Sequence, residues 1–120
     1  MRVLIVESEP DLGRLWDAHL TRQGHEVELE SGQDGAVSRL GEAGYDVIVL
    51  DLFLASGSAF AVADYAAYRH PEVKIVFVTS TSFFSDGSIF RLMPNACAFL
   101  PTGTSPEDLT AVVEHYGAVH

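Results

Sequence analysis

The chain has 120 residues, 48% of them hydrophobic and 20% charged, which suits one domain with its own core and excludes an intrinsically disordered chain. Seven lysine and arginine residues stand against 17 aspartate and glutamate residues, and the formal net charge of −10 argues against direct binding to DNA or RNA. The single cysteine, Cys97, excludes an internal disulfide. No apolar stretch approaches the roughly 20 residues of a membrane span, so we expect a cytoplasmic protein without a membrane partner.

The first half of the chain alternates short strands with amphipathic helices. A continuous aliphatic run at residues 3–6 predicts a strand buried on both faces. Apolar residues at helical spacing follow, from Pro10 in the first turn to the Gln23-Gly24 stop. Residues 26–30 alternate glutamate with valine or leucine, which predicts an edge strand with one wet face, and residues 33–43 predict a second helix. The apolar positions of the first helix are Leu12, Leu15, Trp16 and Leu20.

The second half continues this alternation. The predicted elements are a strand over residues 47–50, a helix over 59–68, a strand over 75–78, a short helix over 86–93, a strand over 96–100 and a last helix that begins at Ser105. Five strand–helix repeats predict an α/β fold in which a doubly wound parallel sheet carries helices on both faces. We expect one domain spanning residues 1–120.

Polar residues follow three of the predicted strands. They are Glu7-Ser8-Glu9 after the first strand, Asp51 after the third, and Thr79-Ser80-Thr81 after the fourth. In a parallel sheet these carboxyl ends share one edge, where function gathers. Acidic oxygens there suit Mg²⁺, and a carboxylate beside a cation can accept a phosphoryl group as nucleophile.

Three segments resemble the response-regulator receiver family of two-component signalling. They are Val3-Leu4-Ile5-Val6-Glu7-Ser8-Glu9-Pro10, Tyr45-Asp46-Val47-Ile48-Val49-Leu50-Asp51-Leu52 and Ile75-Val76-Phe77-Val78-Thr79-Ser80. The resemblance covers essentially the whole chain and implies a flavodoxin-like (CheY-like) sheet with strand order 2-1-3-4-5.

The resemblance also implies a role for each matching residue. Asp51 would be the phosphoacceptor, Thr79 the switch hydroxyl and Phe99 the aromatic switch residue. Glu7, Asp51 and the carbonyl of Phe53 would hold Mg²⁺. The partners implied are a histidine kinase or phosphotransfer protein and a downstream protein target. A homodimer through the fourth helix, fifth strand and fifth helix is also implied.

Two departures from the family pattern stand out. Ser8 occupies the position of the acid that normally ligates the metal directly, and we expect it to be an inert replacement rather than a ligand through water. The lysine and proline that normally end strand five are replaced by Thr102 and Gly103, counted back from the Ser105 helix start. A shifted alignment puts Pro101 on the proline, but Leu100 then replaces the lysine.

No alignment restores that lysine, because Lys74 is the only lysine in the chain and precedes the fourth strand. At roughly 3.3 Å per strand residue it lies about 17 Å from the active edge. Losing the lysine removes a charge-assisted contact of roughly 1.5–3 kcal/mol.

Two functions therefore remain open: a receiver controlled by phosphorylation of Asp51, or a pseudo-receiver that binds a partner without phosphorylation. An enzyme is not expected, because Phe53 interrupts the Asp-x-Asp of a dehalogenase-like phosphatase, and Gly-x-Ser-x-Gly and P-loop motifs are absent. If the chain is complete, it acts by docking to another protein.

Three further groups of residues lie outside the predicted acid site. Cys97 is expected to be a small buried hydrophobe, and the histidines at positions 19, 25, 70, 115 and 120 are expected at the surface, since they lack metal-ligand spacing. Phe83, Phe84 and Phe90 form either an exposed patch for a partner or a partly packed loop.

Overall fold

A computed structural model describes residues 1–79 and 95–118 of the chain. Its nine described elements run in the order β1 (Arg2–Val6), α1 (Pro10–Arg22), β2 (Glu26–Glu30), α2 (Gln33–Glu42), β3 (Val47–Asp51), α3 (Ala59–Arg69), β4 (Lys74–Thr79), β5 (Ala96–Pro101) and α5 (Pro106–Gly117). The described residues do not include the short helix predicted at residues 86–93. They also do not include Phe83, Phe84 and Phe90, so the predicted patch stays a prediction.

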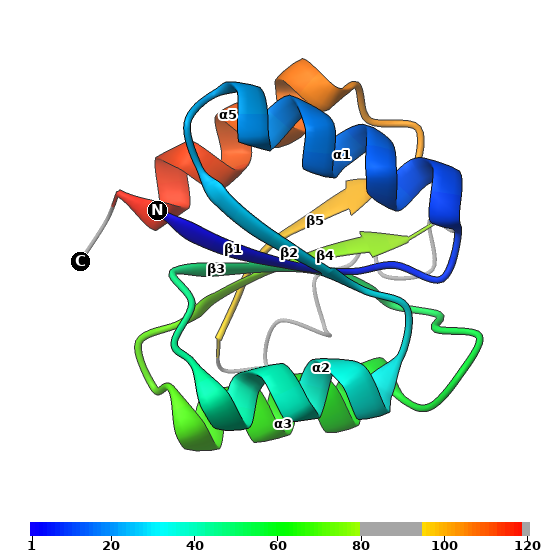
Figure 1. The fold of residues 1–120 in the computed structure, drawn as a ribbon, viewed down its shortest axis with the longest axis vertical. Helices are drawn as coiled ribbons and strands as arrows, with labels where there is room; N and C mark the ends of the chain where they lie inside the picture. The colour runs from blue at the N-terminus through cyan, green and yellow to red at the C-terminus, as the bar shows by residue number, and fades with distance from the viewer. Residues whose placement is uncertain (80–94, 119–120) are drawn as a thin grey trace.

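The five strands form one parallel sheet in the order β2-β1-β3-β4-β5, as the resemblance implied. Helices α1 and α5 cover one face of the sheet, and α2 and α3 cover the other (Figure 1). The three inner strands are almost wholly buried because a helical layer lies on each side of them. The predicted α/β architecture is therefore confirmed.

Alternate residues of the inner strands feed two separate hydrophobic cores. Leu4, Ile48 and Phe77 pack toward α2 and α3. Val3 and Val49 pack toward α1 and α5. This alternation is the strand period of two, and it explains why these runs contain no polar residue before they reach the carboxyl edge.

Strand β2 is an edge strand, as predicted, and its glutamates form ion pairs with arginines. Glu28 lies 2.9 Å from an Arg2 guanidinium nitrogen and also pairs with Arg39. Tyr45 donates its hydroxyl to Glu28 at 2.9 Å. Burial raises the pKa of Glu28, but the hydrogen bond from Tyr45 and the Arg39 charge outweigh it, so the pKa lies below its usual value.

The positions of three side chains differ from those that the sequence predicts. The helical spacing places Leu15 on the apolar stripe of α1, yet it is 48% exposed, while Trp16 on the same helix is 1% exposed. The prediction that His19 and His25 lie at the surface is wrong, because their side chains are only 18% and 10% exposed. His19 Nδ1 lies 2.8 Å from Thr110 Oγ1, and His25 Nε2 lies 2.8 Å from Glu114 Oε2, so both histidines link the α1–β2 region to α5.

Candidate functional site

The carboxyl ends of β1, β3 and β4 lie side by side. Val6 pairs with Leu50 and Leu50 with Phe77, so the next positions along the strands, where Glu7 and Asp51 lie, are close together. Glu7, Asp51 and Thr79 are 3%, 9% and 6% exposed. The predicted convergence of these polar residues at one edge of the sheet is therefore confirmed.

Glu7 is the most perturbed ionisable group of this edge. Burial raises its pKa to about 8, helped by a hydrogen bond with the Asp51 side chain and by the Asp51 charge. Its Oε2 atom is buried and makes no hydrogen bond within residues 1–79 and 95–118. A buried carboxyl oxygen without a donor is costly as an anion, so burial favours the protonated form of Glu7.

Asp51 ends strand β3, and the start of the following loop orients its carboxylate. The backbone N–H of Phe53 donates to Asp51 Oδ1 at 3.0 Å. The N–H of Leu52 donates to the carbonyl of Val78 at 2.8 Å, which ties this turn to β4. One carboxylate oxygen of Asp51 is thereby held by the backbone. The Phe53 side chain points outward and is 58% exposed.

Thr102 lies beside Thr79, at the position where the family pattern expects a lysine. The Thr102 N–H donates to the carbonyl of Thr79 at 3.0 Å, which places Thr102 at the active edge. Gly103 follows it, and apart from its chain neighbours no atom of residues 1–79 and 95–118 lies within 4 Å of where a Cβ would be. This supports the alignment that puts Thr102 and Gly103, rather than Leu100 and Pro101, on the lysine and proline.

Phe99 lies on β5, which β4 separates from the strand that carries Asp51. Its ring stacks on Phe77 with centroids 5.1 Å apart and planes at 11°. It therefore packs with the core that faces α2 and α3. Ser80 and Thr81, which the sequence placed at the same edge, lie outside the described residues.

Ser8 was predicted to be an inert replacement for a metal ligand, yet its hydroxyl makes two hydrogen bonds. Ser8 Oγ accepts the N–H of Ala55 at 2.8 Å and lies 3.4 Å from the carbonyl of Ser31, to which it donates. The hydroxyl thus connects the loop after β1 to the loops after β2 and β3. Neither contact is visible in the sequence, because the partners are 47 and 23 residues away.

The donor set that the resemblance implies for a cation consists of two carboxylates and a carbonyl. The described residues contain no group of three or more His, Cys, Asp or Glu side chains suited to a metal. The buried Oε2 atom of Glu7 without a donor, next to Asp51, nevertheless matches the hard oxygen ligands that Mg²⁺ prefers, and Mg²⁺ commonly keeps several of its waters. The residues present fit a magnesium site with fewer acids than the family pattern expects.

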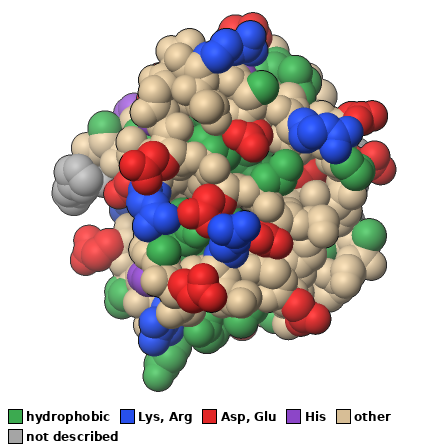
Figure 2. Space-filling model, viewed as in Figure 1, with side chains coloured by type: hydrophobic (Ala, Val, Ile, Leu, Met, Phe, Trp, Pro, Cys, Tyr) green, Lys and Arg blue, Asp and Glu red, His purple; other side chains and the backbone are tan. Residues whose placement is uncertain are grey.

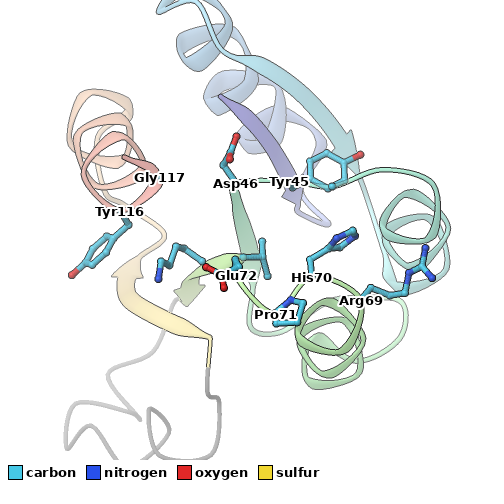
Figure 3. A pocket seen from close by; sticks show the side chains of 11 residues that line it. Tyr45, Asp46, Arg69, His70, Pro71, Glu72, Tyr116 and Gly117 are labelled. Atoms are coloured by element: carbon cyan, nitrogen blue, oxygen red, sulfur yellow. The ribbon is translucent and has the colours of Figure 1, made fainter. Parts of the chain in front are cut away.

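Lys74 lies at the opposite, amino-terminal edge of the sheet. It is the first residue of β4 and pairs with Val47, the first residue of β3. It lines a cavity of about 310 Å³ together with Asp46, His70 and Tyr116, which come from three different parts of the chain (Figure 3). The predicted separation of Lys74 from Asp51 is confirmed, and Lys74 cannot replace the missing lysine.

Cys97 is half-buried on β5 and packs with the core that faces α1 and α5. Burial raises the pKa of its thiol to about 11, so it stays protonated. The prediction of a packing role is borne out in kind, although the side chain is only partly buried. No helix among the described residues has the length and apolar character that crossing a membrane requires.

No family model matches the chain. Among curated proteins, it is 29% identical to the response regulator protein PilR of Pseudomonas aeruginosa over 90% of the chain and 23% of that protein. It is 28% identical to the transcriptional regulatory protein TcrA of Mycobacterium tuberculosis over 72% of the chain and 34% of that protein. The chain thus spans about a quarter to a third of these relatives.

Solved structures give the same fold. The receiver domain protein (CheY-like) of Methanospirillum hungatei superposes with a TM-score of 0.87 at 21% identity, over 97% of this chain and 92% of that one. The receiver domain of NtrX from Brucella abortus gives 0.86 at 22% identity, over 98% and 99%. The strand order and these likenesses show that the chain has the receiver (CheY-like) fold, and its sequence is similar to that of a response regulator protein.

Proposed function

We propose that this domain is an atypical receiver in which Asp51 accepts a phosphoryl group from a histidine kinase or phosphotransfer protein. The observation that carries the proposal is the meeting of Glu7, Asp51 and Thr79 at three neighbouring strand ends, all of them buried. A buried acid pair at the carboxyl edge of a parallel sheet marks a functional site rather than a solvated loop.

The transfer would use the Asp51 oxygen that the backbone does not hold. Because the Phe53 N–H donates to Oδ1, Oδ2 would be the oxygen that attacks phosphorus. An O–P bond forms to Asp51 while the P–N bond to the donor histidine breaks, and the imidazole keeps that electron pair. The Thr79 hydroxyl would then bond a phosphoryl oxygen.

Charge is the main obstacle to this transfer. Glu7 and Asp51 already place two acids in a buried space, and the raised pKa of Glu7 favours its neutral form, which relieves part of the repulsion. Mg²⁺, held by the Glu7 and Asp51 carboxylates and the Phe53 carbonyl, would neutralise charge on the phosphoryl oxygens.

The lysine position supports an alternative. With Thr102 at that position and Lys74 at the far edge of the sheet, no lysine can pair with a phosphoryl group on Asp51. Phosphorylation could then be slow and weakly coupled to Phe99. The alternative is a pseudo-receiver, which recognises its partner without phosphorylation.

Both versions act by protein–protein contact rather than by turnover. We propose that the domain is not an enzyme and that it signals in the cytoplasm to a downstream protein. A homodimer through α5, β5 and the helix that the sequence predicts at residues 86–93 is part of this proposal. The net charge of −10 disfavours direct contact with nucleic acid.

The deciding experiment is the mass of the protein after incubation with a small acyl phosphate and Mg²⁺. Wild type should gain one phosphoryl group and Asp51→Asn should gain none. Asp64→Asn, a change at an exposed acid of α3, serves as the matched control and should behave as wild type. Lack of any mass gain in wild type would leave the pseudo-receiver as the function.

A second measurement tests coupling. Addition of beryllofluoride to the ¹⁵N-labelled protein should shift the resonances of Phe99 and α5 if the modified state reaches the docking face. Changes confined to the neighbours of Asp51 would show modification without signalling.

A further inference from the structure

The loop between β3 and α3, residues 52–58, is hydrogen-bonded to the acid site. It begins directly after Asp51, and its Phe53 N–H bonds the Asp51 carboxylate at 3.0 Å. The Phe53 carbonyl belongs to the proposed cation site. Any shift of this loop therefore moves both the orientation of Asp51 and one of the cation's ligands.

Ser8 holds the middle of this loop. Its Oγ accepts the Ala55 N–H at 2.8 Å and donates to the Ser31 carbonyl at 3.4 Å. A hydroxyl can do both at once, because it carries one donor and two acceptor lone pairs. An ionised carboxylate at position 8 could accept from Ala55 but would face the Ser31 carbonyl with no proton to offer.

Gln33 holds the end of the same loop. Its N–H donates to the Ser56 carbonyl at 3.1 Å, and its Oε1 accepts the Ser58 N–H at 2.8 Å. Gly57 permits this close approach, because it has φ +86° and a Cβ there would lie 2.3 Å from the Gln33 Cβ. The loop is therefore attached to the rest of the carboxyl edge at two places, and only the Ser8 attachment coincides with a family metal position.

We propose that Ser8 is a positioning residue, whose hydroxyl holds the loop carrying Phe53 against the carboxyl edge and so orients Asp51 before any cation binds. The inference rests on the proposed function, since Asp51 is the group being oriented. In this chain the position of an acidic metal ligand has become a hydrogen-bonded link between three loops. The cation is bound more weakly because one carboxylate ligand is missing, but the loop is held in place without a cation.

The test compares wild type with Ser8→Ala, Ser8→Thr and Ser8→Asp, each ¹⁵N-labelled and measured with and without Mg²⁺. Without Mg²⁺, the Ala55 amide should be protected from hydrogen exchange in wild type and Ser8→Thr. It should exchange about tenfold faster in Ser8→Ala, the usual effect of losing one hydrogen bond. Ser56→Ala is the matched control, because it keeps the backbone carbonyl that accepts from Gln33, and it should leave Ala55 unchanged.

Ser8→Asp separates positioning from simple stability. It should bind Mg²⁺ more tightly than wild type, expose the Ala55 amide without Mg²⁺ and protect it again when Mg²⁺ is added. Wild type should show no Mg²⁺ dependence at Ala55. The rate of phosphoryl uptake should fall in Ser8→Ala and recover in Ser8→Thr.

Equal Ala55 exchange in wild type and Ser8→Ala, or protection in wild type that requires Mg²⁺, would overturn the inference. The failure of the proposed function alone would give a distinguishable result. If Ala55 behaves as expected but wild type gains no phosphoryl mass, Ser8 still holds the loop and the phosphoacceptor role of Asp51 fails.

Discussion

At the scale of single residues, burial and the Asp51 charge make the ionised form of Glu7 unfavourable. Glu7 is buried next to Asp51, and one of its oxygens has no donor among the described residues. Folding therefore favours the protonated form of Glu7, which is why its pKa rises to about 8. Such a conflict is common where a site must receive a cation or a transferring group.

Glu7 should make the folded state less stable as pH rises. Below its unfolded pKa of 4.5 the group is protonated in both states, and between 4.5 and about 8 only the folded state keeps the proton. The free energy of unfolding should then fall by up to about 1.4 kcal/mol per pH unit across this window and level off above it.

Urea denaturation at a series of pH values, without Mg²⁺, checks this prediction. Glu7→Gln, which mimics the protonated acid, should lose the slope that Glu7 contributes. An identical pH profile in wild type and Glu7→Gln would show that Glu7 ionises as easily in the folded state as in the unfolded one.

Thr102 is the residue at which the lost lysine can be restored. Its N–H donates to the Thr79 carbonyl, so the backbone of a lysine at position 102 would lie at the carboxyl edge of the sheet. Thr102→Lys should speed phosphoryl uptake by Asp51 about tenfold or more, because a charge-assisted contact contributes roughly 1.5–3 kcal/mol.

The rate of mass gain from a small acyl phosphate measures this effect. Thr104→Lys, which adds the same charge two residues later, should give a much smaller change. A similar acceleration in both variants would mean that the added charge, and not its place beside Thr79, is responsible.

At the scale of elements, α5 is held by its cap and by two histidines. Ser105 Oγ accepts the N–H of Asp108 at 3.2 Å, with Pro106 next in the chain. His19 and His25 then bond Thr110 and Glu114 further along the helix. The helix is thereby attached to the α1–β2 region by polar contacts as well as by its buried Leu109 and Val113.

Removal of the Ser105 cap should destabilise the domain without disturbing the acid site. Ser105→Ala should lower the free energy of unfolding by about 1 kcal/mol, measured by urea denaturation. Ser105→Asp should retain most of the stability, because aspartate also accepts from the first turn. A loss of equal size in both variants would mean that the hydroxyl itself, rather than N-capping, is needed.

At the scale of the whole molecule, the acid pair and the lysine lie at opposite edges of the sheet. Asp51 and Glu7 lie at the carboxyl edge, while Lys74 and the 310 Å³ cavity lie at the amino edge. Acidic side chains are scattered across the face seen in Figure 2, several of them next to basic ones. This mixture fits a net charge of −10 that is spread over the surface.

The only lysine should therefore be irrelevant to phosphoryl uptake. Lys74→Gln should gain phosphoryl mass at the wild-type rate, because β4 separates Lys74 from the edge that carries Asp51. Mass spectrometry with the same acyl phosphate checks this. A clear fall in the rate would mean that Lys74 reaches the site in some other arrangement of the chain.

The sequence by itself determined the alternation of strands and helices, the burial of the inner strands and the meeting of Glu7 with Asp51. These follow from local periodicity and from the rule that parallel strands share a carboxyl edge. It also determined that no lysine can reach Asp51, since the chain has only one.

Only the tertiary structure decided what Ser8, His19 and His25 do. Their partners lie 23 to 91 residues away, and no local pattern encodes which hydroxyl or imidazole will meet which backbone group or acid. The same holds for the Glu7 oxygen that finds no donor in the described part of the chain. Strand and helix positions follow from the spacing of apolar residues, whereas hydrogen-bond partners depend on how loops from distant parts of the chain come together.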